Sequence, residues 1–187
     1  MKVTGRLPDV ITFAGNGEPT SHPEFEEIID DTIALRDKFC PKAKLSVLSN
    51  ATFIHRKRVR DALMKVENNI LKLDTADINY IKKVDRPANP HYDLRQIIND
   101  MKAFNGHLII QTMFLKGTLD GEDVSNVSAK YVLPWLEALK EIRPMAVMIY
   151  TIDRDTPAEN LQKATPEELE SIRQQVINAG FSCLAAY

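Results

Sequence analysis

Polar residues gather where the apolar runs of this sequence end. The first run ends in Gly15-Asn16-Gly17-Glu18-Pro19, and the glycines let backbone atoms approach a ligand closely. Carbonyl groups in such a turn can accept hydrogen bonds from an ammonium group. The glycine spacing fits neither a Rossmann fingerprint nor a P-loop. The segment is therefore a candidate turn for binding an amine, with a tight turn and a solvated Glu18 as the structural alternative.

Two charged residues, Lys72 and Asp74, interrupt a later apolar run and stand two positions apart. On a strand they would point to the same side. Burying such a pair is costly unless it has a partner or a task, so we expect the two side chains to hold a ligand. A structural ion pair is one alternative. A lysine in this place is also compatible with a Schiff-base lyase, in which Lys72 would attack a carbonyl group.

Three further apolar runs end in polar groups: Ser49-Asn50 after the second run, Gln111-Thr112 in the fourth and Tyr150 at the end of the fifth. Positioning these residues together requires a regular architecture. The sequence predicts strands at residues 9–14, 45–48, 70–74, 108–113, 146–150 and 181–184. Helical spacing of apolar residues fills the gaps between them, with helix starts predicted at 21–24 and 165–168.

Strands that alternate with helices, without hairpin signals between them, predict parallel pairing through crossovers. Residues 116–128 form the longest polar stretch and are predicted to be a loop. An open doubly wound sheet and a (β/α) barrel, whole or partial, both satisfy this pattern. In either architecture ligands bind at the carboxyl ends of the strands, where the polar residues lie. We expect one domain over residues 1–187.

The composition narrows the class of protein. The 187 residues are 44% hydrophobic and 27% charged, with a formal charge of −2, which argues against a broad nucleic-acid surface. No apolar stretch approaches the length of a membrane helix, and the first residues lack the apolar run of a secretory signal. Two cysteines exclude a disulfide scaffold and a four-thiolate site, and the four histidines lack metal-ligand spacing. A cytoplasmic, soluble protein is expected.

The strand-end motifs, taken in order over residues 9–155, resemble the radical S-adenosylmethionine superfamily. The turn at 15–19 is similar to that superfamily's Gly-Gly-Glu-Pro motif, whose backbone binds the methionine amino group. The resemblance implies an α/β fold, a partial (β/α) barrel of about six parallel strands with outer helices. It also implies ten cofactor-binding residues: Asn16, Gly17, Glu18, Pro19, Ser49, Asn50, Lys72, Asp74, Gln111 and Tyr150.

One feature departs from the superfamily. Its members carry a Cys-x3-Cys-x2-Cys trio that holds a four-iron–four-sulfur cluster, and neither Cys40 nor Cys183 matches that trio. We therefore expect the chain to be a fragment that lacks the first strand and its cluster loop, and that binds no cluster alone.

The complete form would then be an iron–sulfur, oxidoreductase-like enzyme that reductively cleaves S-adenosylmethionine to a 5′-deoxyadenosyl radical. The expected partner is the small-molecule cofactor. The sequence does not name the substrate, and a tRNA substrate is left open. The alternatives are the Lys72 lyase and a degenerate, non-catalytic scaffold that still binds a ligand.

Overall fold

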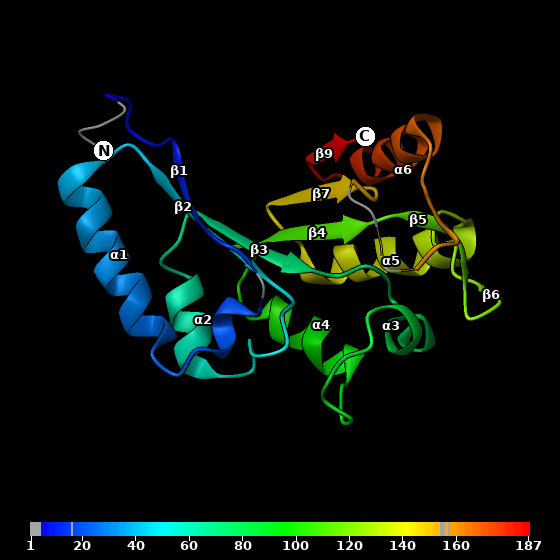
Figure 1. The fold of residues 1–187 in the computed structure, drawn as a ribbon, viewed down its shortest axis with the longest axis horizontal. Coiled ribbons are helices and arrows are strands. Elements are labelled where there is room, and N and C mark those ends of the chain that lie inside the picture. Colours follow the sequence, from blue (N-terminus) through cyan, green and yellow to red (C-terminus); the bar gives the residue numbers. More distant parts are fainter. Residues whose placement is uncertain (1–4, 16, 154–155, 157) are drawn as a thin grey trace. The chain divides into compact units, whose positions relative to one another are not determined.

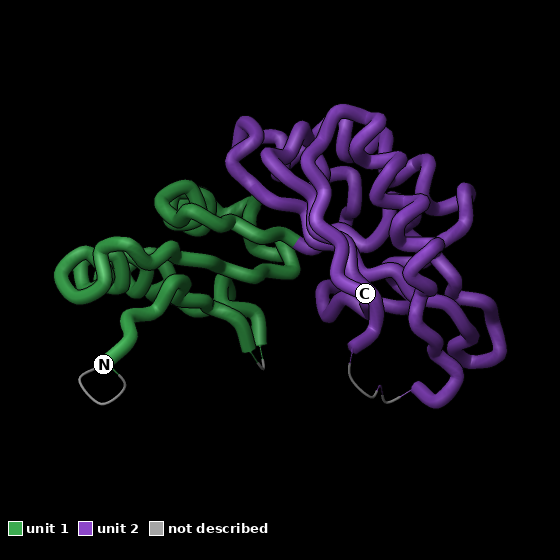
Figure 2. Tube along the Cα trace, turned by 90° about the horizontal axis from the view of Figure 1, so that it is seen from above, with its two compact units in different colours: residues 1–71 green, residues 72–187 purple. Residues whose placement is uncertain are grey.

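The fold is seen in a computed structural model, which describes residues 5–15, 17–153, 156 and 158–187. The chain divides into an N-terminal unit, residues 1–71, and a C-terminal unit, residues 72–187 (Figure 2). That the 187 residues form one domain stays a prediction.

The N-terminal unit is built on parallel strands. β1 (Val10–Phe13) pairs with β2 (Lys44–Ser49), and β2 pairs with β3 (Asn68–Lys72), whose last residue begins the second unit. The connecting helices are α1 (Phe25–Phe39) and α2 (Lys57–Leu63), which pack against each other (Figure 1). Leu45, Ser46 and Val47 are consecutive and all buried, as expected for a strand covered on both faces.

The C-terminal unit repeats this design. β4 (Ile109–Met113), β7 (Ala146–Tyr150) and β9 (Cys183–Ala186) are parallel neighbours. Its helices are α3 (Ile78–Val84), α4 (Leu94–Lys102), α5 (Ala129–Ile142) and α6 (Pro166–Asn178). α4 packs on α5, and α6 packs on β7 and β9 (Figure 1). The predicted α/β class, with about six parallel strands and helical connections, is confirmed.

Alternation along the strands decides which side chains face a ligand. On β4 and β7, Ile110, Thr112, Val147 and Ile149 are buried. Gln111 and Tyr150 belong to the opposite, half-buried face of these strands. Gln111 is paired with Met148, and Met113 with Tyr150. Gln111 and Tyr150 therefore lie on neighbouring strands with a register offset of two residues.

The loop predicted at residues 116–128 is wrong. The chain there forms a hairpin from β5 (Leu115–Leu119) and β6 (Glu122–Asp123), and β8 (Leu161–Lys163) pairs antiparallel with β5. Asp120 and Gly121 both have positive φ, 53° and 80°, as a two-residue hairpin turn of the Asp-Gly type requires. That dipeptide was the available signal. It was missed because the polar strands around it lack apolar alternation.

The first helix also begins later than predicted. α1 starts at Phe25, whereas Ser21 ends a short 3₁₀ helix, Pro19–Ser21. The carboxylate of Glu18 caps that 3₁₀ helix by accepting the N–H of Thr20. The predicted capping box at Thr165 and Glu168 is confirmed, with both of its hydrogen bonds present. Among the residues that the structure describes, no helix is long and apolar enough to cross a membrane.

Candidate functional site

The Glu18 carboxylate lies at the centre of the candidate residues of the N-terminal unit. It accepts hydrogen bonds from Thr20 N (3.1 Å), Thr20 Oγ1 (2.5 Å), Ser49 Oγ (2.7 Å) and Asn50 N (2.7 Å). Oε1 accepts three of these hydrogen bonds and Oε2 accepts one, and hydrogen bonds to a charged acceptor are among the stronger ones. The alternative of a solvated Glu18 is therefore wrong. The side chain ties the turn after β1 to the loop after β2.

The loop after β2 is held in an unusual conformation. Ser49 Oγ accepts the N–H of Ala51 (3.0 Å), and Asn50 Oδ1 accepts the N–H of Thr52 (2.9 Å). Ala51 is fully buried with φ of 64°, a left-handed conformation that L-residues with a Cβ adopt at a cost of about 1 kcal/mol or more. Such strain persists only where neighbouring contacts hold it, and here Glu18 and Ser49 supply them.

The backbone at Gly17 faces open space. A Cβ built on Gly17 would meet no heavy atom within 4 Å, and its φ lies outside the left-handed range that favours glycine. A tight-turn requirement therefore does not explain this glycine, and there is room beside it for a ligand. Pro19 begins the 3₁₀ helix on the other side of Glu18. Asn16, the fourth predicted residue of this turn, lies outside the described residues.

The charged residues Lys72 and Asp74 form a triad with a third residue of the C-terminal unit, Asp85. Lys72 Nζ lies 2.9 Å from Asp74 Oδ2 and 2.8 Å from Asp85 Oδ1. Asp74 is only 4% exposed, and its Oδ1 accepts the N–H of Met113 on β4 at 2.9 Å. Asp85 follows α3 directly. It was missed because α3 was not predicted, and its position thirteen residues after Lys72 carries no strand periodicity.

The backbone between Lys72 and Asp74 is anchored from two elements. The carbonyl of Leu73 accepts hydrogen bonds from Thr112 Oγ1 (2.7 Å) on β4 and from Trp135 Nε1 (3.1 Å) on α5. Its N–H donates to the carbonyl of Gln111 (3.0 Å). The two charged side chains therefore project from a backbone that is fixed on both of its polar atoms.

Burial and charge act in opposite directions on the triad. Burial raises the pKa of Asp74 to about 7, and Asp85 reinforces this, although Lys72 lowers it. For Lys72 burial favours the neutral form, but Asp74 and Asp85 together outweigh it and raise the pKa of the amine. Lys72 therefore stays protonated at neutral pH. At Asp74 the effect of burial, which raises the pKa, outweighs the opposing effect of Lys72.

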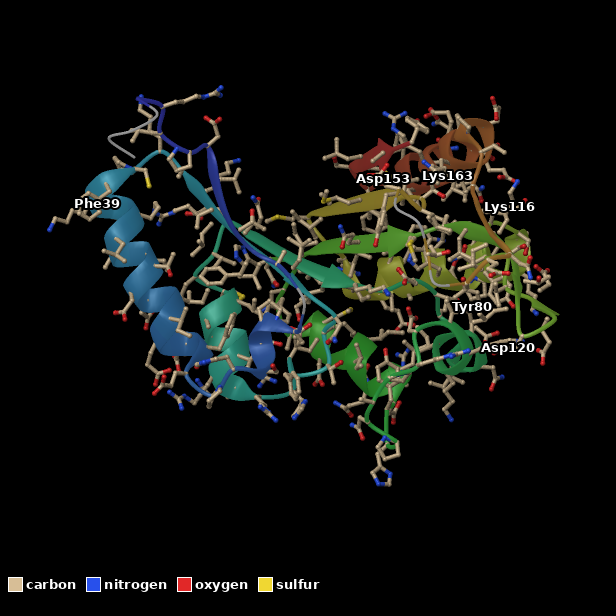
Figure 3. All side chains as sticks on the ribbon, in the orientation of Figure 1. Phe39, Tyr80, Lys116, Asp120, Asp153 and Lys163 are labelled. Carbon is tan, nitrogen blue, oxygen red and sulfur yellow. The ribbon has the colours of Figure 1, made fainter. Side chains whose placement is uncertain are left out.

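Three tyrosines surround these carboxylates. Burial, together with the charges of Asp74 and Asp85, raises the pKa of Tyr80 and Tyr150, and raises that of Tyr92 to about 12. All three phenols remain protonated donors at neutral pH. Tyr80, on α3 in Figure 3, donates to the carbonyl of Val124 at 3.1 Å and packs edge-on against Tyr131. It connects α3 to the hairpin segment.

A pocket of about 440 Å³ opens beside Gln111 and Tyr150 in the C-terminal unit. Apolar side chains of β7 and β9, including Met148 and Leu184, line it together with Asp153. The structure thus sorts the predicted residues into three groups. Gly17, Glu18, Pro19, Ser49 and Asn50 come together in the N-terminal unit, whereas Lys72 with Asp74, and Gln111 with Tyr150, come together in the C-terminal unit.

An iron–sulfur cluster does not fit the thiols of this chain. The sequence has two cysteines, Cys40 and Cys183, and they belong to different units. Both are buried, and burial raises the pKa of Cys183 to about 11, so it is not a ready thiolate. Within the described ranges, no group of three or more His, Cys, Asp or Glu residues is arranged to hold a metal ion.

No family model matches the chain. It is similar to curated proteins described as UPF0026. A Helicobacter pylori protein (strain J99) is 28% identical over 148 residues, covering 78% of this chain and 44% of the relative. A Synechocystis protein is 32% identical over 112 residues, covering 58% of this chain and 40% of the relative. The matches thus span less than half of the length of these relatives.

Solved structures agree in fold over nearly all of the chain. A radical SAM methyltransferase from Sphaerobacter thermophilus matches with a TM-score of 0.72 at 16% identity, covering 100% of this chain and 53% of that one. A domain of a pyruvate-formate lyase-activating enzyme from Bacteroides vulgatus gives 0.66 at 18%, covering 95% and 98%. Streptococcus suis SuiB bound to S-adenosylmethionine gives 0.67 at 15%, covering 95% and 39%. The chain therefore has the α/β fold of radical S-adenosylmethionine enzymes, as the sequence motifs predicted.

Proposed function

We propose that this chain is the cofactor-binding core of a radical S-adenosylmethionine enzyme. The observation that carries the proposal is the turn at Gly17 and Glu18. Glu18 fixes the backbone of this turn through four hydrogen bonds, and the open space at Gly17 leaves room for a ligand. A rigid turn with free space is what recognition of an amine by backbone carbonyls needs. The SuiB structure, which has the same fold, was solved with S-adenosylmethionine bound.

The predicted residues of the C-terminal unit also offer polar groups to a ligand. Lys72 donates to two carboxylates, the partners found for it in the described part of the chain, and its third N–H is left for a ligand. Its side chain is one-third exposed, at 33%. Gln111 and Tyr150 offer an amide and a phenol at the pocket on β7 and β9. We propose that these groups contact the cofactor or the substrate.

The reaction class is reductive cleavage of S-adenosylmethionine to methionine and a 5′-deoxyadenosyl radical. It requires an electron-donating centre that Cys40 and Cys183 do not fit. We therefore assign this chain the binding and orientation of the cofactor, and we expect the chain alone to be inactive. Substrate and product stay undefined, because no described residue selects among the substrates that such a radical attacks.

The lyase alternative is weaker. A Schiff-base lysine must lose its proton to attack a carbonyl group. Lys72 is held between two carboxylates, and its pKa is raised, so it is a poor nucleophile at neutral pH. Incubation with pyruvate and borohydride followed by mass spectrometry tests this directly. A covalent adduct on Lys72 would show that its amine reacts with a carbonyl group. It would not by itself decide against the proposed core, because TYW1, a structure of similar fold with a TM-score of 0.66, was solved with a lysine–pyruvate adduct bound.

Calorimetric titration of the chain with S-adenosylmethionine tests the proposal. Measurable binding is expected, and Gly17→Val should abolish it at an unchanged melting temperature, because a Cβ at this position meets no heavy atom within 4 Å and the backbone φ is not one that favours glycine. A matched control is Ala14→Val, a change at an exposed residue on the near side of the turn. No binding by the wild-type chain, or equal binding by Gly17→Val, would contradict the proposal.

A further inference from the structure

A proton and the ammonium group of Lys72 compete for the carboxylate of Asp74. Its Oδ1 accepts a backbone N–H from Met113 at 2.9 Å, and its Oδ2 faces Lys72 Nζ at 2.9 Å. The side chain is almost fully buried. Each oxygen thus meets a hydrogen-bond donor, an arrangement that suits the ionised form.

The charges around Asp74 favour the protonated form instead. Asp85 contributes a second carboxylate to the same ammonium, so the ionised triad carries one net negative charge around the buried Asp74. Among the described residues, three further titratable groups interact with the charge of Asp74: Tyr80 from α3, Tyr92 from the segment before α4 and Tyr150 from β7. All three are neutral phenols and do not compensate the excess charge. A buried, uncompensated negative charge is removed most cheaply by protonation.

Protonation of Asp74 would change the position of Lys72. Oδ1 can still accept the N–H of Met113, whereas a proton on Oδ2 would point a donor at the ammonium group, which is also a donor. The two donors must separate. Asp85 Oδ1, at 2.8 Å, is already a partner of Lys72 and keeps the ammonium when Asp74 releases it.

We propose that Asp74 is a proton-binding site that switches Lys72 between two arrangements. With Asp74 ionised, Lys72 bridges Asp74 and Asp85. When Asp74 takes up one proton from solvent, Lys72 is held by Asp85 alone, and its ammonium group points away from Asp74. The titration lies near neutrality because burial and Asp85 both raise the pKa of Asp74. The switch does not depend on S-adenosylmethionine binding, and it would make the ligand groups offered by Lys72 dependent on pH.

Carbon-13 NMR of the aspartate carboxyl groups in the full chain tests the switch. The Asp74 carboxyl carbon should titrate with a midpoint of about 7, and the ¹⁵N shift of Lys72 Nζ should move with the same midpoint. Asp85→Asn removes the like charge and should lower the Asp74 midpoint by about one pH unit or more. Asp120→Asn, a change to an aspartate in the exposed hairpin turn, is the matched control and should leave the midpoint unchanged.

Asp74→Asn should abolish the transition at Lys72, because its amide presents a permanent donor to the ammonium group. An Asp74 carboxyl carbon that stays ionised down to about pH 5 would overturn the proposal. A titrating Asp74 with an unmoved Lys72 resonance would overturn the coupling. Should Asp74→Asn fail to fold, the wild-type and Asp85→Asn titrations decide the question. None of these measurements involves the cofactor, so they can fail independently of the proposed function.

Discussion

The carboxylate of Glu18 accepts the backbone N–H of Asn50 at 2.7 Å, across 32 positions of sequence. One side chain after β1 thereby fixes the backbone that follows β2, and the strained residue Ala51 comes next. The turn that we propose for cofactor binding and the polar pair Ser49-Asn50 are consequently one mechanical unit.

Glu18→Gln should weaken this unit. The amide oxygen can still accept, but the NH₂ group would face a backbone donor, either the Asn50 N–H or the Thr20 N–H. We expect the free energy of unfolding to fall by about 1–3 kcal/mol in urea titrations. The exposed Glu24 makes no side-chain capping bond, so Glu24→Gln should change it by less than about 0.5 kcal/mol. Equal effects of the two changes would argue against the role of Glu18.

The pH dependence of stability should carry a contribution from Asp74. Its pKa is about 7 in the folded chain and about 4 when unfolded. The contribution of a group with a raised pKa is complete below about pH 4, and it is lost as pH rises towards 7, because the folded state must then give up a proton or bury a charge. Between these values the wild type should lose stability relative to Asp74→Asn.

Urea unfolding of both proteins at about pH 5 and about pH 8 measures that difference. Other groups change stability with pH in the opposite direction. At Glu67, for example, hydrogen bonds from Leu45 N–H and Arg36 outweigh burial and lower the pKa. Because Glu67 is present in both proteins, its contribution cancels in the comparison. Parallel stability curves for wild type and Asp74→Asn would show that Asp74 does not titrate in this range.

Gly117→Ala should disrupt the small antiparallel sheet. A Cβ on Gly117 would lie 2.0 Å from the carbonyl oxygen of Asn160, a backbone atom that also accepts the N–H of Thr118. Gly121 also has positive φ but has open space around it, so Gly121→Ala adds conformational strain without a clash. Thermal unfolding should therefore show a clearly larger loss for Gly117→Ala, with about 1 kcal/mol for the control. Similar losses would mean that β8 is not closely packed on β5.

Arg143→Gly should stabilise the chain. Arg143 ends α5 with φ of 56°, a left-handed cap that glycine adopts without a steric cost, and its side chain is exposed. A gain of roughly 0.5–1 kcal/mol is expected in the free energy of unfolding. Arg143→Ala removes the same side chain but retains a Cβ, so it should give no gain. A stabilisation by alanine as large as that by glycine would assign the effect to the side chain.

The parallel framework could be predicted from the sequence because its signals are local. Each principal strand is a short apolar run, and the capping box at Thr165 and Glu168 marks a helix start by itself. α3 and the hairpin at Asp120-Gly121 were missed because their elements are short, with seven residues in α3 and two in β6. Their cohesion comes from distant contacts, such as the buried cluster of Tyr80, Leu115 and Val124.

The candidate site was predictable in its members and not in its connections. Strand periodicity was enough to place Lys72 and Asp74 on one side, and they do form an ion pair. That Asp85 shares the lysine depends on how α3 returns to the strand end, which no spacing reveals. Two of the four hydrogen bonds to Glu18, those from Ser49 and Asn50, likewise join segments more than thirty residues apart.

The bond from Trp135 to the carbonyl of Leu73 gives the chain an optical reporter. Trp135 is the sole tryptophan of the sequence, and it is 1% exposed. Its indole N–H donates a hydrogen bond to the carbonyl of Leu73, the residue between Lys72 and Asp74. Indole emission shifts when that hydrogen bond or its dry surroundings change. Tryptophan fluorescence of the unmodified chain should therefore follow events at this peptide group without an added label, separately from the tyrosine signal.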